Sequence, residues 1–119
     1  MNMLFQAINR CLGSQHNYVA SEMECRALSA NLGVGERCTR ATNFSVSTKL
    51  GVINILECII SNDCGNRHTE VVVTYDEELV YKYFVYNDGS VDVEVDVDDG
   101  IWKPMLIYVS DNLSNTRGE

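Results

Sequence analysis

The chain has little basic charge, no long apolar run and a single proline. Nine Lys and Arg stand against 17 Asp and Glu among 119 residues, for a formal net charge of −8. Phosphate binding needs a surplus of Lys and Arg, so nucleic acid is not expected as a direct ligand. The longest uncharged apolar run is well short of a membrane span, so no membrane partner is expected either.

The motifs of the common enzyme classes are also lacking. The sequence has no Gly-rich phosphate loop, no G-x-S-x-G elbow and no zinc-protease helix. Acidic residues are numerous, but general acid–base catalysis needs one carboxyl group in an apolar pocket, which an exposed acidic stripe does not provide. We therefore expect a protein that is not an enzyme and carries no cofactor.

Five cysteines are present: Cys11, Cys25, Cys38, Cys58 and Cys64. The odd count and the lack of a signal-peptide pattern argue against a secreted disulfide framework. We expect a cytoplasmic protein in which most thiols are buried apolar groups. Cys64 follows Ser61-Asn62-Asp63 in a predicted turn, where an exposed thiol is expected.

No metal site is predicted. Cys58, Cys64 and His68 lie within eleven residues, but five residues separate the two cysteines where structural zinc sites have two to four. The acidic residues before Gly100 do not follow the EF-hand order, which leaves only a looser calcium site at Asp98 and Asp99 as an alternative.

Charge divides the chain into two unequal halves. Residues 1–68 carry six basic and five acidic residues, whereas residues 69–119 carry three basic and twelve acidic ones. The first half is therefore nearly neutral, and the second holds a net charge of −9. Such asymmetry indicates an interaction surface.

The first half is predicted to be mainly helical. Leu4, Ile8, Cys11 and Leu12 have helical spacing before Gly13. A capping box at Ser21–Glu24 begins a second helix that ends near Gly33. Residues 36–48 are predicted to form a loop or a short strand. Residues 50–60 are read as a third helix, with a buried strand as the alternative because many of them are β-branched.

From residue 69 the hydrophobic period becomes two, which predicts four strands at 69–75, 79–86, 90–98 and 101–109. Their short connections favour an antiparallel meander. Pro104 would place the last strand at an edge or a bulge. We predict one α+β domain over residues 1–110, with two or three N-terminal helices packed on a four- to five-stranded sheet. Residues 111–119 are predicted to be a flexible tail.

Valine and acid alternate along residues 91–98. In a strand, Val91, Val93, Val95 and Val97 would share the core face, and Asp92, Glu94, Asp96 and Asp98 the other. Asp99 would extend the acidic row at the next turn.

The preceding strand can be aligned through its turn. A three-residue loop at 87–89 with Gly89 in the left-handed conformation pairs Tyr86 with Ser90 and places Lys82 opposite Glu94. Val80, Phe84 and Tyr86 would then lie on the acidic face, and Leu79, Tyr81, Tyr83 and Val85 on the valine face.

Two interpretations of this acidic face compete. It is either a solvated strand face that limits edge pairing, or a binding face for a basic partner. Carboxylates at regular spacing beside aromatic rings resemble a nucleic-acid backbone in physical terms. Our hypothesis is a small inhibitor that occupies a basic, nucleic-acid-binding surface of a partner protein, as phage anti-restriction and anti-CRISPR mimics do. The expected binding residues are Asp92, Glu94, Asp96, Asp98, Asp99, Phe84 and Tyr86.

Other functions remain open on the sequence. One is a small-molecule-binding or catalytic domain with a pocket between helices and sheet, an element order shared with NTF2-like domains. A deep cavity lined by Tyr81 and Tyr83 would favour it. Another is an acidic immunity or chaperone-like protein, for which a homodimer is compatible with the sequence.

Overall fold

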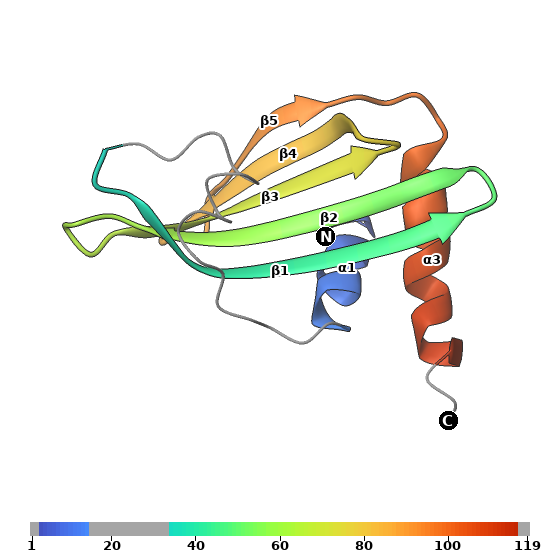
Figure 1. Ribbon diagram of the computed structural model, residues 1–119, viewed down its shortest axis with the longest axis horizontal. Coiled ribbons are helices and arrows are strands. Elements are labelled where there is room, and N and C mark those ends of the chain that lie inside the picture. The colour runs from blue at the N-terminus through green and yellow to red at the C-terminus, as the bar shows by residue number, and fades with distance from the viewer. Residues whose placement is uncertain (1–2, 15–33, 117–119) are drawn as a thin grey trace.

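The computed structural model describes residues 3–14 and 34–116. Within these two ranges, one helix precedes and one follows a five-stranded antiparallel sheet whose strands lie side by side in chain order (Figure 1). The elements are α1 (Met3–Gly13), β1 (Arg37–Thr48), β2 (Gly51–Ser61), β3 (Arg67–Tyr75), β4 (Glu78–Tyr86), β5 (Val91–Asp96) and α3 (Trp102–Thr116). The α+β class and the meander are therefore confirmed, whereas the expected group of N-terminal helices is corrected to one helix at each end of the described chain.

Helix α1 forms where the apolar spacing predicts it. Leu4, Ile8, Cys11 and Leu12 are buried on one side of the helix. Beyond Gly13, the backbone N–H of Ser14 donates to the Cys11 carbonyl at 3.2 Å. The second predicted helix, from Ser21 to Gly33, lies outside the described residues.

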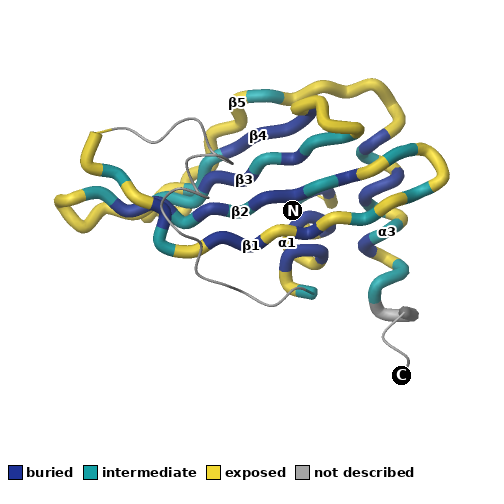
Figure 2. The backbone as a smooth tube through the Cα atoms, in the orientation of Figure 1, coloured by how far each residue is buried: buried dark blue, intermediate teal, exposed yellow. Residues whose placement is uncertain are grey.

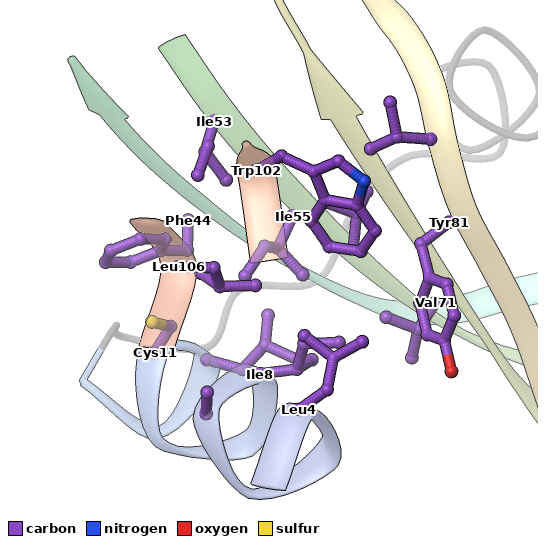
Figure 3. Close-up of a cluster of buried hydrophobic side chains, with 14 of the residues drawn as sticks. Leu4, Ile8, Cys11, Phe44, Ile53, Ile55, Val71, Tyr81, Trp102 and Leu106 are labelled. Carbon is purple, nitrogen blue, oxygen red and sulfur yellow. The ribbon is translucent and has the colours of Figure 1, made fainter. Parts of the chain in front are cut away.

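The main core lies between the two helices and one face of the sheet (Figure 3). Both helices pack on the same face of the sheet. Residues of α1 and the α3 residues Trp102 and Leu106 share one buried cluster with side chains of β1 to β3: Phe44, Ile53, Ile55, Val71 and Val73. Tyr81 and Tyr83 of β4 complete this core and are both nearly fully buried. The two tyrosines therefore pack against the helices, as expected.

The prediction of a helix over residues 50–60 is wrong, because these residues form strand β2. Ile53 and Ile55 point to the helices, while Leu56, Cys58 and Ile60 lie on the opposite face, where they join a second, smaller buried cluster. A strand that is buried on both faces shows a continuous apolar run instead of an alternation. That run matched helical spacing by coincidence.

The prediction of a strand over residues 101–109 is also wrong, because helix α3 occupies this segment and continues to Thr116. Two residues explain the helix start. The Asp99 carboxylate accepts hydrogen bonds from the backbone N–H groups of Ile101 at 2.9 Å and Trp102 at 3.4 Å. Pro104 lies in the first turn, where its missing N–H removes no helical hydrogen bond. Residues 111–116 are therefore part of a helix and not a flexible tail.

Strand β5 is the edge of the sheet and is exposed along most of its length (Figure 2). Val91 is 44% and Val93 42% exposed, because neither helix extends over the side of β5 on which these residues lie. The expectation that the valine face is buried is therefore corrected. Only the tyrosine face of the neighbouring strand β4 lies in the core.

Candidate partner-binding site

The turn between β4 and β5 has the predicted geometry. Tyr86 and Ser90 pair through a backbone hydrogen bond of 3.0 Å, and Gly89 adopts the left-handed conformation at φ 85°. The Asp88 carboxylate accepts a hydrogen bond of 2.9 Å from the backbone N–H of Ser90, and hydrogen bonding from Ser90 lowers the pKa of Asp88. Asp88 is therefore a charged, exposed residue at the tip of the hairpin.

A β-bulge divides the predicted row of acids. Tyr83 pairs with Val93 as expected, but Lys82 pairs with Val95, so Glu94 is the extra residue. One extra residue reverses the alternation of side chains beyond it. Asp92 lies across from Phe84 on the face away from the helices, whereas Asp96 lies across from Tyr81 on the helix side. The continuous acidic row is therefore corrected to two separate groups.

A second bulge, in β4, moves two apolar residues to the faces opposite to those expected. Val73 pairs with Tyr81 and Thr74 with Leu79, so Val80 is the extra residue. Val80 is consequently buried in the main core, and Leu79 is 43% exposed. Phe84 and Tyr86 lie beyond this bulge and keep their predicted face.

Lys82 is buried between two carboxylates on the face away from the helices. Its Nζ atom lies 3.7 Å from Glu94 Oε1 and 3.9 Å from Glu70 Oε2, and 5.5 Å from the centre of the Phe84 ring. The side chain of Lys82 is 10% exposed, and that of Glu70 is 1% exposed. The predicted contact between Lys82 and Glu94 is present, but the lysine ammonium lies within the protein and not on the surface.

Three rings lie beside this ion pair. Phe84 and Tyr86 stack with their ring centres 6.4 Å apart, and the His68 ring of β3 lies 5.8 Å from Phe84 and 6.0 Å from Tyr86. His68 pairs with Tyr86 across the two strands. His68 was not among the predicted binding residues, although extending the period of residues 69–75 by one position places it on this face.

Asp96 and Asp98 bind Lys103 of α3. Lys103 Nζ lies 2.7 Å from Asp96 Oδ1 and 3.7 Å from Asp98 Oδ2, and the hydrogen bond to Asp96 raises the pKa of Lys103. The same ammonium group lies 5.6 Å from the Trp102 ring centre. Together with the helix cap at Asp99, these contacts join the end of β5 to α3. The three acids thus have partners within the chain.

Of the seven predicted binding residues, four share one surface. Asp92, Glu94, Phe84 and Tyr86 lie on the face away from the helices, and Asp88 adjoins them at the turn. We call these five residues the acidic hairpin surface. Asp96, Asp98 and Asp99 belong instead to the junction between β5 and α3.

The concentration of charge in this region is high. Residues 76–99 contain nine acidic residues and one basic residue, Lys82, for a net charge of −8. This value equals the net charge of the whole chain. Because Lys82 is buried, its charge lies beneath the surface that the hairpin acids present to solvent.

Glu57 of β2 and Tyr83 of β4 are two titratable residues on the helix side of the sheet whose charges influence each other. Burial raises the pKa of Glu57, an effect that Arg40 partly offsets, and burial together with the charge of Glu57 raises the pKa of Tyr83. Three hollows on the described surface are lined by residues other than Glu57, Tyr83 and Tyr81.

The described cysteines differ in oxidation state and burial. Cys38 is disulfide-bonded, whereas Cys11, Cys58 and Cys64 are free thiols. Cys64 is exposed in the turn between β2 and β3, as predicted. Among the described residues, no three His, Cys, Asp or Glu side chains are arranged to hold a metal ion.

We expect iodoacetamide at pH 8 to label Cys64 at least about a hundredfold faster than Cys58 in the folded protein. Burial raises the pKa of Cys58 and of Cys11 to about 11. Both thiols therefore stay protonated at pH 8, where roughly one molecule in a thousand carries the reactive thiolate at either position. Peptide mass spectrometry after brief labelling measures this ratio, and Cys64→Ser should remove the fast reaction at this position. Equal labelling of Cys58 and Cys64 before unfolding would contradict the burial of β2.

No family model, curated protein or solved structure matches the chain. Within the described ranges, no helix is long and apolar enough to cross a membrane. The function therefore has to be inferred from the surface itself.

Proposed function

We propose that this protein is a small non-enzymatic binding protein that occupies a basic surface of a partner protein. The acidic hairpin surface is its contact region. A nucleic-acid-binding surface is the partner site that fits best, because such sites combine Lys and Arg with a preference for regularly spaced anionic charge. Inhibitors of restriction or CRISPR complexes that mimic nucleic acid act in this way.

The observation that carries the proposal is the charge of residues 76–99. Residues 76–99 carry nine acids and one lysine, and Asp88, Asp92 and Glu94 lie on the acidic hairpin surface. The lysine is buried beside Glu94 and Phe84. Like charges this close repel one another, so the arrangement costs free energy in the isolated protein. A basic partner surface would relieve that repulsion and gain electrostatic steering.

Aromatic side chains give the same surface an apolar component. Tyr86 is 42% exposed and stacks on the half-buried Phe84, which fixes its ring beside Asp92. Exposed tyrosines supported by neighbouring rings are frequent anchors in protein interfaces. The contact region is therefore a compact acidic and aromatic patch instead of the long row of acids that the sequence suggested.

The proposal predicts that Asp92→Asn with Glu94→Gln weakens partner binding about tenfold to a hundredfold. Both side chains keep their size while two negative charges are lost from the acidic hairpin surface, and close charge pairs across an interface contribute about 1 kcal/mol or more each. The measurement is binding of the tagged protein to partners isolated from its native host, with affinity determined over a series of salt concentrations.

A matched control separates the site from general acidity. Asp63→Asn with Asp111→Asn removes the same charge from the turn after β2 and from α3, where both acids are exposed. This control should bind like the unchanged protein. Binding that ignores ionic strength, or that falls equally in both double variants, would refute the acidic hairpin surface as the contact region.

A further inference from the structure

Strand β5 is the edge of the sheet, and among the described strands it pairs only with β4 (Figure 2). An edge strand presents N–H and C=O groups to which a further strand can bind, and proteins usually blunt such an edge with charges, bulges or a covering element. β5 has acidic side chains and a bulge at Glu94, but no described element covers it. The protection of this edge is therefore largely electrostatic, and it depends on the charge of the strand that approaches.

The outward backbone groups of β5 belong to Val91 and Val93. The Tyr86 N–H donates to the Ser90 carbonyl at 3.0 Å, so these two residues are a hydrogen-bonded pair at the start of the ladder. Hydrogen-bonded and non-hydrogen-bonded pairs alternate along antiparallel strands. The backbone of Asp92 therefore bonds to β4, whereas the N–H and C=O groups of Val91 and Val93 point to the outer side of the sheet.

The same two valines give this edge an apolar strip on the helix side. Val91 is 44% and Val93 42% exposed, and Val93 lies across from Tyr83. The Phe5 ring of α1 packs on Tyr83, with the ring centres 4.8 Å apart. A strand added to β5 would place every second side chain beside the valines and bury them, which extends the main core outward.

The opposite face of β5 discriminates by charge. Asp92 and Glu94 are exposed there, and the Glu94 side chain is 51% exposed. Like charges directly opposite each other on two strands are destabilising, whereas opposite charges are stabilising. Pairing between two β5 strands would place the acids of one copy beside those of the other, which disfavours a second copy of this chain. A strand with Lys or Arg at every second position complements the same carboxylates.

We propose that β5 binds an extended basic segment of the partner protein as an additional strand of the sheet. The segment alternates Lys or Arg, on the side of Asp92 and Glu94, with apolar residues on the side of Val91 and Val93. Its backbone bonds to the outward N–H and C=O groups of the two valines, the mode by which extended peptides are added to sheet edges. This inference rests on the proposed function and assigns the partner contact to the edge of β5 as well as to its acidic face.

The probe for the test is a capped peptide of three Lys-Val repeats, titrated into the isotope-labelled full chain and followed by NMR. We expect saturable binding with a dissociation constant of about 1 mM. With the peptide at about ten times that concentration, the outward N–H groups of Val91 and Val93 should exchange with solvent about tenfold more slowly. The N–H of Asp92 already bonds to β4 and should change less. Chemical-shift changes confined to Asp92 and Glu94, without slower exchange at the valines, would overturn the proposal.

Control peptides separate strand addition from simple charge attraction. Three Glu-Val repeats reverse the charge, and a peptide with three Lys followed by three Val keeps the composition without the alternation. A Lys-Val peptide that is N-methylated at every residue keeps the charges but has no N–H donor for the carbonyls of Val91 and Val93. Each control should bind at least about tenfold more weakly than the probe. Equal binding of the N-methylated peptide would refute strand addition.

A proline substitution tests the edge in the protein itself. Val93→Pro removes one outward N–H and keeps the bonds to β4, because proline is tolerated on an edge strand where the N–H faces solvent. It should weaken binding of the peptide and of the partner at least about tenfold. Val93→Ala is the matched control, which keeps the N–H and should weaken binding by about threefold or less. The amide spectrum checks that both variants fold, and equal losses in the two would contradict the backbone contact.

The partner-binding assay separates this inference from the proposed function. If Asp92→Asn with Glu94→Gln weakens partner binding but Val93→Pro does not, the partner binds the acidic face alone, and strand addition is refuted while the proposed function holds. Partner binding that is insensitive to Asp92 and Glu94 would refute the proposed function itself. Sedimentation equilibrium of the protein alone should show a monomer. A dimer that Val93→Pro dissociates would place a second copy on the edge and overturn the proposal.

Discussion

Replacing Trp102 by alanine is expected to lower the free energy of unfolding by about 3–5 kcal/mol. Trp102, the first residue of α3, is fully buried. The centre of its ring lies 5.6 Å from that of Tyr81 in β4. Its indole N–H also donates to the Val97 carbonyl at 2.6 Å, which joins α3 to the segment after β5. A domain of this size has about 5–15 kcal/mol of stability in total, so the variant should be largely destabilised.

Urea unfolding followed by far-UV circular dichroism measures this loss. Tryptophan fluorescence cannot report on the variant, because Trp102 is the only tryptophan in the chain. Trp102→Phe keeps most of the ring but loses the hydrogen bond to Val97, and should cost less than Trp102→Ala. Tyr108→Ala, at an α3 residue that is 69% exposed, is the matched surface control and should change stability by less than about 0.5 kcal/mol. A Trp102→Ala cost below about 1 kcal/mol would contradict the packing of α3.

The β3–β4–β5 meander was predictable from the sequence because its signals are local. Short polar turns join segments of period two, and a three-residue loop with Gly89 at its end determines how Tyr86 and Ser90 pair. Helix α1 was predictable for the same reason, since Leu4, Ile8 and Cys11 are spaced for one helical face. In these segments the local pattern and the final fold agree.

The two wrong assignments have different physical causes. Strand β2 is buried on both faces, and a buried strand cannot be distinguished from a buried helix by periodicity alone. Helix α3 did carry signals, namely Asp99 as a cap and Pro104 in the first turn. Pro104 taken alone is equally typical of an edge strand or a bulge, so it does not distinguish the two structures. Reading Asp99 and Pro104 together would have predicted the helix.

The sequence predicted the faces of β4 and β5 correctly only between their shared turn and the two bulges, at Val80 and Glu94. Asp92 and Phe84 share a face because the register near the turn is correct, but each bulge inserts one residue and reverses the faces beyond it. Neither Val80 nor Glu94 differs from its neighbours in a way that marks a bulge in the sequence.

Replacing Lys82 by methionine is expected to lower the free energy of unfolding by about 3–5 kcal/mol, the same range as for Trp102→Ala. Lys82 lies between Glu70 and Glu94, and the substitution would leave the Glu70 carboxylate in the interior without this ammonium group. Urea unfolding at neutral pH measures the loss. Lys103→Met is the matched control: the carboxylates that Lys103 contacts are at least half exposed, so the loss should be about 1 kcal/mol.

A double-mutant cycle tests whether the cost comes from losing the contact between Lys82 and Glu70. Glu70→Met with Lys82→Met removes both members of the buried pair, and the double variant should be more stable than Lys82→Met alone by several kcal/mol, because apolar groups of similar volume often replace a buried ion pair with little loss. Glu94→Gln should cost less than about 1 kcal/mol, since the Glu94 side chain is 51% exposed and screened by solvent. Additive losses in the cycle would show that Lys82 and Glu70 do not interact. The expected non-additive result would instead assign Lys82 to the stability of the sheet beneath the acidic hairpin surface, which leaves Asp92 and Glu94 to attract a basic partner.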